Sequence, residues 1–195
     1  MIILVGKSCS GKDSVTKELT KMGYSRIVTY TTRPMRDGEI DGVEYHFISK
    51  GLFNTMVSNN EFAEWKSYET KEGEWLYGNK KCDYTQGRKI ISLTPDGVKR
   101  IREEIDIPMT IIYLKVSNHA IKDRMKKRDK NLKESKRRYK ADKNDFKNVE
   151  NLVDYIVINE NRDAFETALI CRELDEIKEK HYNNKETRNI KDILF

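Results

Sequence analysis

Residues 1–14 read Met-Ile-Ile-Leu-Val-Gly-Lys-Ser-Cys-Ser-Gly-Lys-Asp-Ser, and this stretch decides the fold. A short apolar run leads into Gly6, and the pair Gly11-Lys12 follows after four intervening residues. This is the pattern of a phosphate-binding loop (P-loop) between a buried strand and a helix. Glycine permits backbone angles that turn successive N–H groups inward, and the positive end of the following helix points at the same place. The stretch predicts nucleotide binding, with a ligand-free Gly-rich turn as the open alternative.

One position of the loop departs from the pattern. A hydroxyl normally follows the lysine and ligates Mg²⁺, but here Asp13 follows Lys12 and a hydroxyl appears only at Ser14. The residues that we expect to contact the bound nucleotide are Gly6, Lys7, Ser8, Cys9, Ser10, Gly11, Lys12, Asp13 and Ser14.

Composition limits the class of protein. The chain has 195 residues, enough for one α/β domain with an insertion or two. Lys and Arg number 38 against 32 Asp and Glu, a net charge of +6 that suits an anionic partner. Nucleotide phosphates account for this charge better than nucleic acid does, because the charges are not interleaved with stacking aromatic residues.

Cysteine usage and hydropathy bear on location. Cys9, Cys82 and Cys171 are far apart and lack metal-ligand spacing, which favours a reducing, cytoplasmic compartment. No apolar stretch approaches the length of a membrane span, and no signal peptide is visible. We therefore expect no membrane association.

Apolar runs alternate with helical patterns along most of the chain, which predicts an α/β fold of three layers around a parallel sheet. Residues 30–80 differ, being rich in turns, charges and Tyr, and predict a small mixed α/β insert with strand-like runs at Val43–Ile48 and Glu61–Trp65. The expected core strands are Ile2–Val5, Arg26–Thr29, Lys89–Leu93, Met109–Val116 and Asp154–Asn159. The expected helices are Asp13–Met22, Asp96–Glu104, His119–Arg128 and Asp163–Lys180.

A second group of functional residues lies in 29–47, which reads Thr-Tyr-Thr-Thr-Arg-Pro-Met-Arg-Asp-Gly-Glu-Ile-Asp-Gly-Val-Glu-Tyr-His-Phe. Arg33 and Arg36 stand close together and are followed by Glu39 and Tyr45. Two guanidinium groups and a Tyr hydroxyl make a good phosphate clamp, because Arg presents paired donors in one plane. A solvated charged loop is the alternative if this segment is taken alone.

The segment resembles the guanylate kinase family, whose pattern Ser-x-Thr-Thr-Arg-x-x-Arg-x-Gly-Glu-x-x-Gly-x-x-Tyr-x-Phe it follows with Thr29 in place of the Ser. The resemblance continues at residues 59–65, 77–79 and 154–159 and covers most of residues 1–180. It implies a P-loop kinase that transfers the γ-phosphoryl group of ATP to GMP or dGMP, giving ADP and GDP. It also implies Mg²⁺ as cofactor and a monomer or homodimer in the cytoplasm.

The resemblance assigns roles to particular residues. Glu64 would accept from the N1–H and amino group of guanine, a paired donor edge that adenine lacks. Asn79 stands where the family usually has Ser or Thr, and its amide can still donate to O6. The residues implied to bind GMP are Thr29, Arg33, Arg36, Glu39, Tyr45, Glu64, Tyr77, Gly78 and Asn79. Those implied to act on the transferring phosphoryl group are Lys12, Arg33, Arg128 and Arg138, with Arg137 as the alternative to Arg138. Arg124 and Asn159 would complete the ATP site.

The same resemblance divides the chain into parts. Residues 30–80 would bind GMP, and the basic segment 122–148 would be a lid over ATP. The core domain would comprise residues 1–29, 81–121 and 149–181. Residues 182–195 would form a C-terminal tail.

The chain departs from the family in the strand that normally carries Asp-x-Asp, where Ser92-Leu93-Thr94 stands. We hypothesise that Asp13 and Ser14 supply the metal ligands instead, because Mg²⁺ prefers hard oxygen donors. In an equally weighted alternative, the Asp13 side chain points to solvent and Ser14 alone ligates the metal. The loss also leaves open a nucleoside monophosphate kinase of altered base choice. A non-catalytic interaction module is disfavoured, because such domains typically lack the lysine and lid arginines that this chain keeps.

Overall fold

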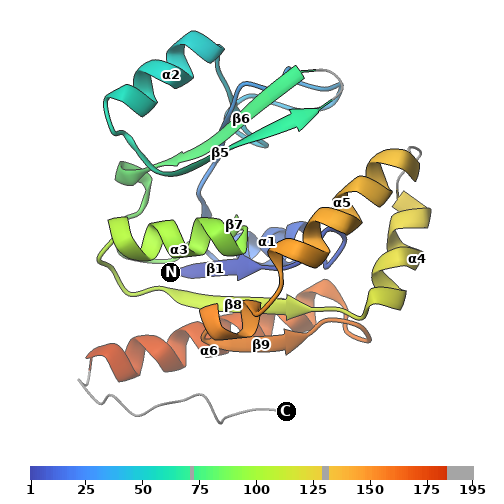
Figure 1. Cartoon of the computed structure of the whole chain (residues 1–195). Coiled ribbons are helices and arrows are strands. Elements are labelled where there is room, and N and C mark those ends of the chain that lie inside the picture. The colour runs from blue at the N-terminus through green and yellow to red at the C-terminus, as the bar shows by residue number, and fades with distance from the viewer. Residues whose placement is uncertain (71–72, 129–131, 184–195) are drawn as a thin grey trace.

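The core of the protein is a five-stranded sheet in the order β2-β7-β1-β8-β9. The computed structural model describes residues 1–70, 73–128 and 132–183 (Figure 1). Every neighbouring pair of strands in this sheet is parallel, which confirms the predicted α/β fold. The strands are β1 (Ile2–Val5), β2 (Ser25–Arg26), β7 (Lys89–Leu93), β8 (Thr110–Lys115) and β9 (Tyr155–Ile158).

The central strand β1 is buried on both faces, and its side chains alternate between two apolar layers. Ile3 and Val5 pack with residues of α3, whereas Ile2 and Leu4 pack with residues of α1 and α6. Burial of each such side chain stabilises the fold by about 1.5–3 kcal/mol, so β1 is held at the centre of the sheet. The P-loop follows β1 in the chain and therefore lies at its carboxyl end. These helices are α1 (Lys12–Lys21), α3 (Pro95–Glu104) and α6 (Ala164–Asn183).

A second, mixed sheet in the order β4-β3-β6-β5 stands above the core sheet in Figure 1. It packs on helix α2 through an apolar cluster of Phe53, Met56, Phe62 and Leu76. Its elements match the mixed insert expected over residues 30–80, but the proposed domain boundaries stay predictions. The elements are β3 (Tyr30–Thr31), β4 (His46–Phe47), α2 (Lys50–Ser58), β5 (Phe62–Thr70) and β6 (Gly73–Lys80).

The predicted strand Arg26–Thr29 is wrong, because the chain changes sheets there. The N–H of Ile27 donates to the carbonyl of Ile90 in β7 at 2.9 Å, while the carbonyl of Thr29 accepts from His46 in β4 at 2.9 Å. The run Val43–Ile48 also shortens to the two residues of β4. Helix α6 extends to Asn183, past the predicted end at Lys180.

The basic segment forms two helices, α4 (Asn118–Arg128) and α5 (Leu132–Asp145). Tyr139 of α5 packs against the cluster of Val116, Ile121 and Met125, which joins the helix to the core. Short 3₁₀ helices lie at Lys81–Asp83 and Val149–Leu152. No helix in the described part of the chain is long and apolar enough to cross a membrane. Residues 129–131 of the predicted lid and 184–195 of the predicted tail lie outside the described residues.

Candidate nucleotide-binding site

The P-loop connects β1 to α1, and its two glycines are required by geometry. Gly11 has φ 97°, and a Cβ there would lie 2.6 Å from Nδ2 of Asn159. A Cβ on Gly6 would overlap the side chain of Ser10. Cys9 also has a positive φ, 62°, so the loop is held in an unusual backbone conformation.

Lys12 folds back over the loop that precedes it. Its Nζ donates to the carbonyl oxygens of Gly6 at 2.5 Å and Lys7 at 3.1 Å. The ammonium group therefore lies at the mouth of the loop, next to the N–H groups that would receive a phosphate. This is the place expected for the lysine of a P-loop.

A cavity of about 520 Å³ adjoins the loop, and residues 9–15 line one side of it. Arg124 of α4 also lines the cavity, and it donates hydrogen bonds to the carbonyls of Cys9 at 3.3 Å and Asn159 at 2.8 Å. Lys127 and Arg162 add positive charge to its lining. Most of the residues predicted to contact ATP, namely residues 9–14, Arg124 and Asn159, therefore line one basic hollow, whereas Gly6, Lys7 and Ser8 do not line it.

Asn159 holds the loop to the end of β9. It is buried, its Nδ2 donates to the carbonyl of Ser10 at 2.8 Å, and its Oδ1 accepts from Thr167 of α6 at 2.8 Å. Both ends of the amide are therefore engaged within the protein. The resemblance implies that Asn159 completes the ATP site, and in the structure its side chain also supports the P-loop.

The first turn of α1 presents hard oxygen donors to the cavity. Asp13 and Ser14 are both exposed there and both line it. No group of three or more His, Cys, Asp and Glu side chains among the described residues forms a ready-made metal site. A carboxylate and a hydroxyl fit Mg²⁺, which is typically bound by one or two carboxylates together with nucleotide phosphates.

The predicted phosphate clamp is assembled in the second sheet. Arg33 is 7% exposed, and its two terminal nitrogens donate to Oε2 and Oε1 of Glu39 at 3.0 and 2.7 Å. Its guanidinium carbon lies 5.3 Å from the ring centre of Tyr45, which meets the ring of Tyr77 at 5.8 Å. Arg36 is exposed, and its backbone N–H also donates to Glu39. Glu39 therefore orients Arg33, and the hydrogen bond from Arg33 lowers the pKa of its carboxyl group.

The two residues predicted to read the base face each other on adjacent strands. Glu64 of β5 and Asn79 of β6 are paired in register, and Nδ2 of Asn79 donates to Oε1 of Glu64. Burial raises the pKa of Glu64, and the hydrogen bond from Asn79 opposes that rise. Oδ1 of Asn79 is buried without a hydrogen-bond partner among the described residues. The predicted donation from Asn79 to O6 of guanine stays a prediction, because the N–H bond of this amide goes to Glu64.

The other residues predicted to contact GMP or the transferring phosphoryl group lie in or next to the second sheet and in helices α4 and α5. A Cβ on Gly78 would lie 3.0 Å from the ring of Phe62, so close packing requires glycine there. Thr29 precedes β3 and pairs through its carbonyl with β4. Arg138 is partly buried and Arg137 is exposed. Arg128 ends α4, and its side chain lies outside the described part of the structure.

Ser92 and Thr94 stand where the family normally has two Asp residues, and Thr94 has a structural role. Thr94 caps the N-terminus of α3, with its Oγ1 accepting from the N–H of Gly97 at 3.2 Å. A Cβ on Gly97 would lie 3.3 Å from Oε2 of Glu64, so the capped helix packs closely against the base-reading carboxylate. The sequence Thr-Pro-Asp-Gly carries this capping signal, because Pro suits the first helical position.

Two side chains near the site escaped the sequence analysis. The ring of Tyr68 meets that of Tyr77 at 5.5 Å, and burial raises its pKa to about 12, with Glu64 adding to the rise. Asp142 of α5 accepts from the backbone N–H of Ser8 in the P-loop at 2.7 Å. Neither residue belongs to a recognisable motif, so no sequence signal marks them.

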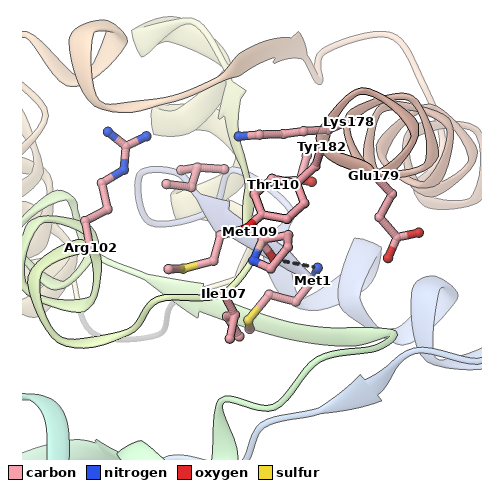
Figure 2. A pocket seen from close by; sticks show the side chains of 10 residues that line it. Met1, Arg102, Ile107, Met109, Thr110, Lys178, Glu179 and Tyr182 are labelled. Atoms are coloured by element: carbon pink, nitrogen blue, oxygen red, sulfur yellow. Dashed lines mark hydrogen bonds between the residues drawn. The ribbon is translucent and has the colours of Figure 1, made fainter. Parts of the chain in front are cut away.

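A second hollow, of about 220 Å³, is shown in Figure 2. It is lined by Met1 and Thr110, which lie at the amino ends of β1 and β8, and by Tyr182 of α6. The P-loop lies at the carboxyl end of β1, where ligands of parallel sheets bind. The larger cavity is therefore the candidate site.

Comparisons with known proteins agree with this geometry. The family described as guanylate kinase matches residues 1–180. The guanylate kinase of Onion yellows phytoplasma is 33% identical over 82% of this chain and 78% of its own length. The guanylate kinase of Helicobacter hepaticus is 31% identical over 88% of each chain. The crystal structure of guanylate kinase from Anaplasma phagocytophilum matches the fold with a TM-score of 0.62 and 18% identity, over 98% of this chain and 88% of that one. The chain belongs to the guanylate kinase family.

Proposed function

We propose that this protein transfers the γ-phosphoryl group of ATP to GMP, giving ADP and GDP. The observation that carries the proposal is that one chain holds two groups of side chains suited to phosphate, the P-loop with Lys12 and the group of Arg33 and Tyr45. Membership of the guanylate kinase family supports it. A protein that only bound nucleotide would not need the second clamp.

ATP would be held by its phosphates and by the cavity beside them. The N–H groups of the P-loop, the start of α1 and Lys12 would bind the phosphates. Arg124 and Asn159 would border the rest of the nucleotide, because both line the cavity next to the loop. The positive lining supports an anionic ligand.

Kinases of this class act on nucleotides that carry a divalent metal. We propose Mg²⁺, held by Asp13 and Ser14 together with the phosphates of ATP. When bound, such an ion neutralises phosphate charge.

GMP would bind across the second sheet. Arg33, Arg36, Tyr45 and Tyr77 would hold its phosphate, and burial raises the pKa of Tyr45, which keeps that hydroxyl a donor. Glu64 would accept from the N1–H and amino group of guanine. Glu39 would act indirectly, by fixing the guanidinium of Arg33.

The reaction itself would depend on position and charge. A phosphate oxygen of GMP forms a new bond to the γ-phosphorus as the bond from that phosphorus to the ADP oxygen breaks. Lys12, Arg33, Arg128 and Arg138 would offset the negative charge of the group in transit. No covalent enzyme intermediate is needed.

These assignments give each segment of the chain a role. We propose that residues 30–80 bind GMP and that residues 122–148 form the lid over ATP. We also propose a cytoplasmic enzyme without nucleic-acid partners, acting as a monomer or homodimer. Cys82 and Cys171 are free thiols, which suits a reducing compartment.

The test is a comparison of phosphoryl acceptors. GMP, dGMP, AMP, UMP and IMP are each supplied with ATP and Mg²⁺, and the diphosphate products are quantified. We expect GMP and dGMP to be used best, because guanine alone presents two donors to Glu64. Equal or better use of AMP or UMP would contradict the proposal and favour altered base choice.

A further inference from the structure

Helix α5 is anchored to the core on both sides of Asp142. Tyr139 packs on the cluster of Val116 and Met125, and Phe146 meets the ring of Tyr113 at 5.8 Å. Residues 139, 142 and 146 fall on one face of a helix by their spacing. The two aromatic contacts therefore direct Asp142 toward the core rather than toward solvent.

The carboxylate of Asp142 lies on the phosphate-binding loop. Its Oδ2 accepts from the backbone N–H of Ser8 at 2.7 Å. Ser8 lies between the two glycines of the P-loop, so this N–H belongs to the group of donors that attracts anions. A carboxylate has the charge and acceptor oxygens of a phosphate group, and a hydrogen bond to an ionised acceptor is stronger than a neutral one.

Asp142 is also close enough to both sheets to act on them electrostatically. Burial raises the pKa of Tyr68 in β5 and of Tyr113 in β8, and the charge of Asp142 adds a smaller part to each rise. One helical turn later, Asp145 approaches Lys66 of β5 at 4.0 Å. Two acids of α5 thus reach different parts of the molecule, and only Asp142 contacts the P-loop.

We propose that Asp142 is an internal competitor of the nucleotide, an acidic latch that occupies the Ser8 N–H until the phosphates of ATP displace it. The latch rests on the proposed function, because it assumes that ATP binds at the P-loop. A phosphate beside this carboxylate is disfavoured by like charge, so binding of ATP requires Asp142 to leave. Release of Asp142 in turn frees α5 from one of its contacts with the core.

The test compares Asp142→Asn with the matched control Asp145→Asn. Both variants remove one negative charge from α5, but only the first alters the contact with Ser8. In the nucleotide-free proteins, hydrogen exchange at the Ser8 amide is followed by NMR. Binding of a non-hydrolysable ATP analogue is measured by calorimetry at fixed salt.

We expect Asp142→Asn to speed exchange of the Ser8 amide and to bind the analogue about threefold to tenfold more tightly than wild type. Asp145→Asn should leave exchange unchanged and alter affinity by less than about twofold. Tighter binding on removal is a result that a merely structural contact would not produce.

Unchanged exchange at Ser8 together with unchanged affinity for the analogue in Asp142→Asn would overturn the latch, because the charge of Asp142 would then have no effect on the Ser8 amide or on phosphate binding. Faster exchange with equal or weaker binding of the analogue would also overturn it, since the contact would then only support the loop. Failure of all three proteins to bind the analogue would instead refute the proposed function, and the competition with it. Because amide exchange is measured without nucleotide, it distinguishes failure of the latch proposal from failure of the proposed function.

Discussion

Asn159→Ala tests whether the P-loop is held by a single buried amide. The variant loses the hydrogen bond to the carbonyl of Ser10 and the one from Thr167, each 2.8 Å long. Two such bonds contribute about 2 kcal/mol together, and a buried carbonyl left unpaired costs about 1 kcal/mol more. Thr167 loses little, because its single hydroxyl proton can donate to the carbonyl of Asp163, 3.0 Å away, instead. We therefore expect a loss of about 3 kcal/mol in the free energy of unfolding.

Urea denaturation measures this loss, with the slope m unchanged and the midpoint lowered. The melting temperature should fall by about 6–12 °C for a chain of this size. Ile158→Ala is the matched control, because it shortens the neighbouring residue of β9, which is 49% exposed, and should cost less than about 1 kcal/mol. If Asn159→Ala is no less stable than Ile158→Ala, Asn159 does not hold the loop.

Three further predictions concern the substrates. Burial raises the pKa of Glu64, so its ionised, acceptor form is lost at a higher pH than for an ordinary Glu, and KM for GMP should rise early on acidification. Glu64→Gln should remove this pH dependence. A pH profile of KM that is the same in the variant and in wild type would contradict the assignment. Arg33→Lys keeps the charge but loses the paired hydrogen bonds to Glu39, so kcat/KM for GMP should fall about 10-fold to 100-fold while KM for ATP changes little. An equal loss for both nucleotides would contradict the assignment of Arg33 to the GMP site. Asp13→Ser should shift the Mg²⁺ concentration that gives half-maximal activity, and an unmoved Mg²⁺ titration would leave Ser14 as the sole protein ligand.

The core sheet follows from the sequence because the signals for its central strand and P-loop are local. The apolar run of β1 and the glycine spacing after it specify strand, loop and helix without reference to the rest of the chain. Lys89–Leu93 is observed as predicted, since a fully buried parallel strand reads as a continuous apolar run. The Arg33 and Tyr45 clamp was found from residue type and motif, and the structure brings these side chains together.

Other features depended on contacts between distant segments. Helix α2 carried a usable signal, since Ser49 caps it and Phe53, Met56 and Val57 have helical spacing, but turns and charges obscured it. The change of sheets after Arg26 is decided by strands that come later in the chain. The contact between Ser8 and Asp142 joins residues 134 apart in sequence, and no pattern in either segment indicates it.

Release of ADP from ATP, with and without GMP, tests the central claim most directly. The purified protein is given ATP and Mg²⁺, ADP is followed by a coupled assay, and GDP is quantified at the end. We predict that ADP appears rapidly only when GMP is present, with one GDP formed for each ADP. ADP release that is independent of GMP, or its absence when GMP is supplied, would contradict phosphoryl transfer between the two nucleotides.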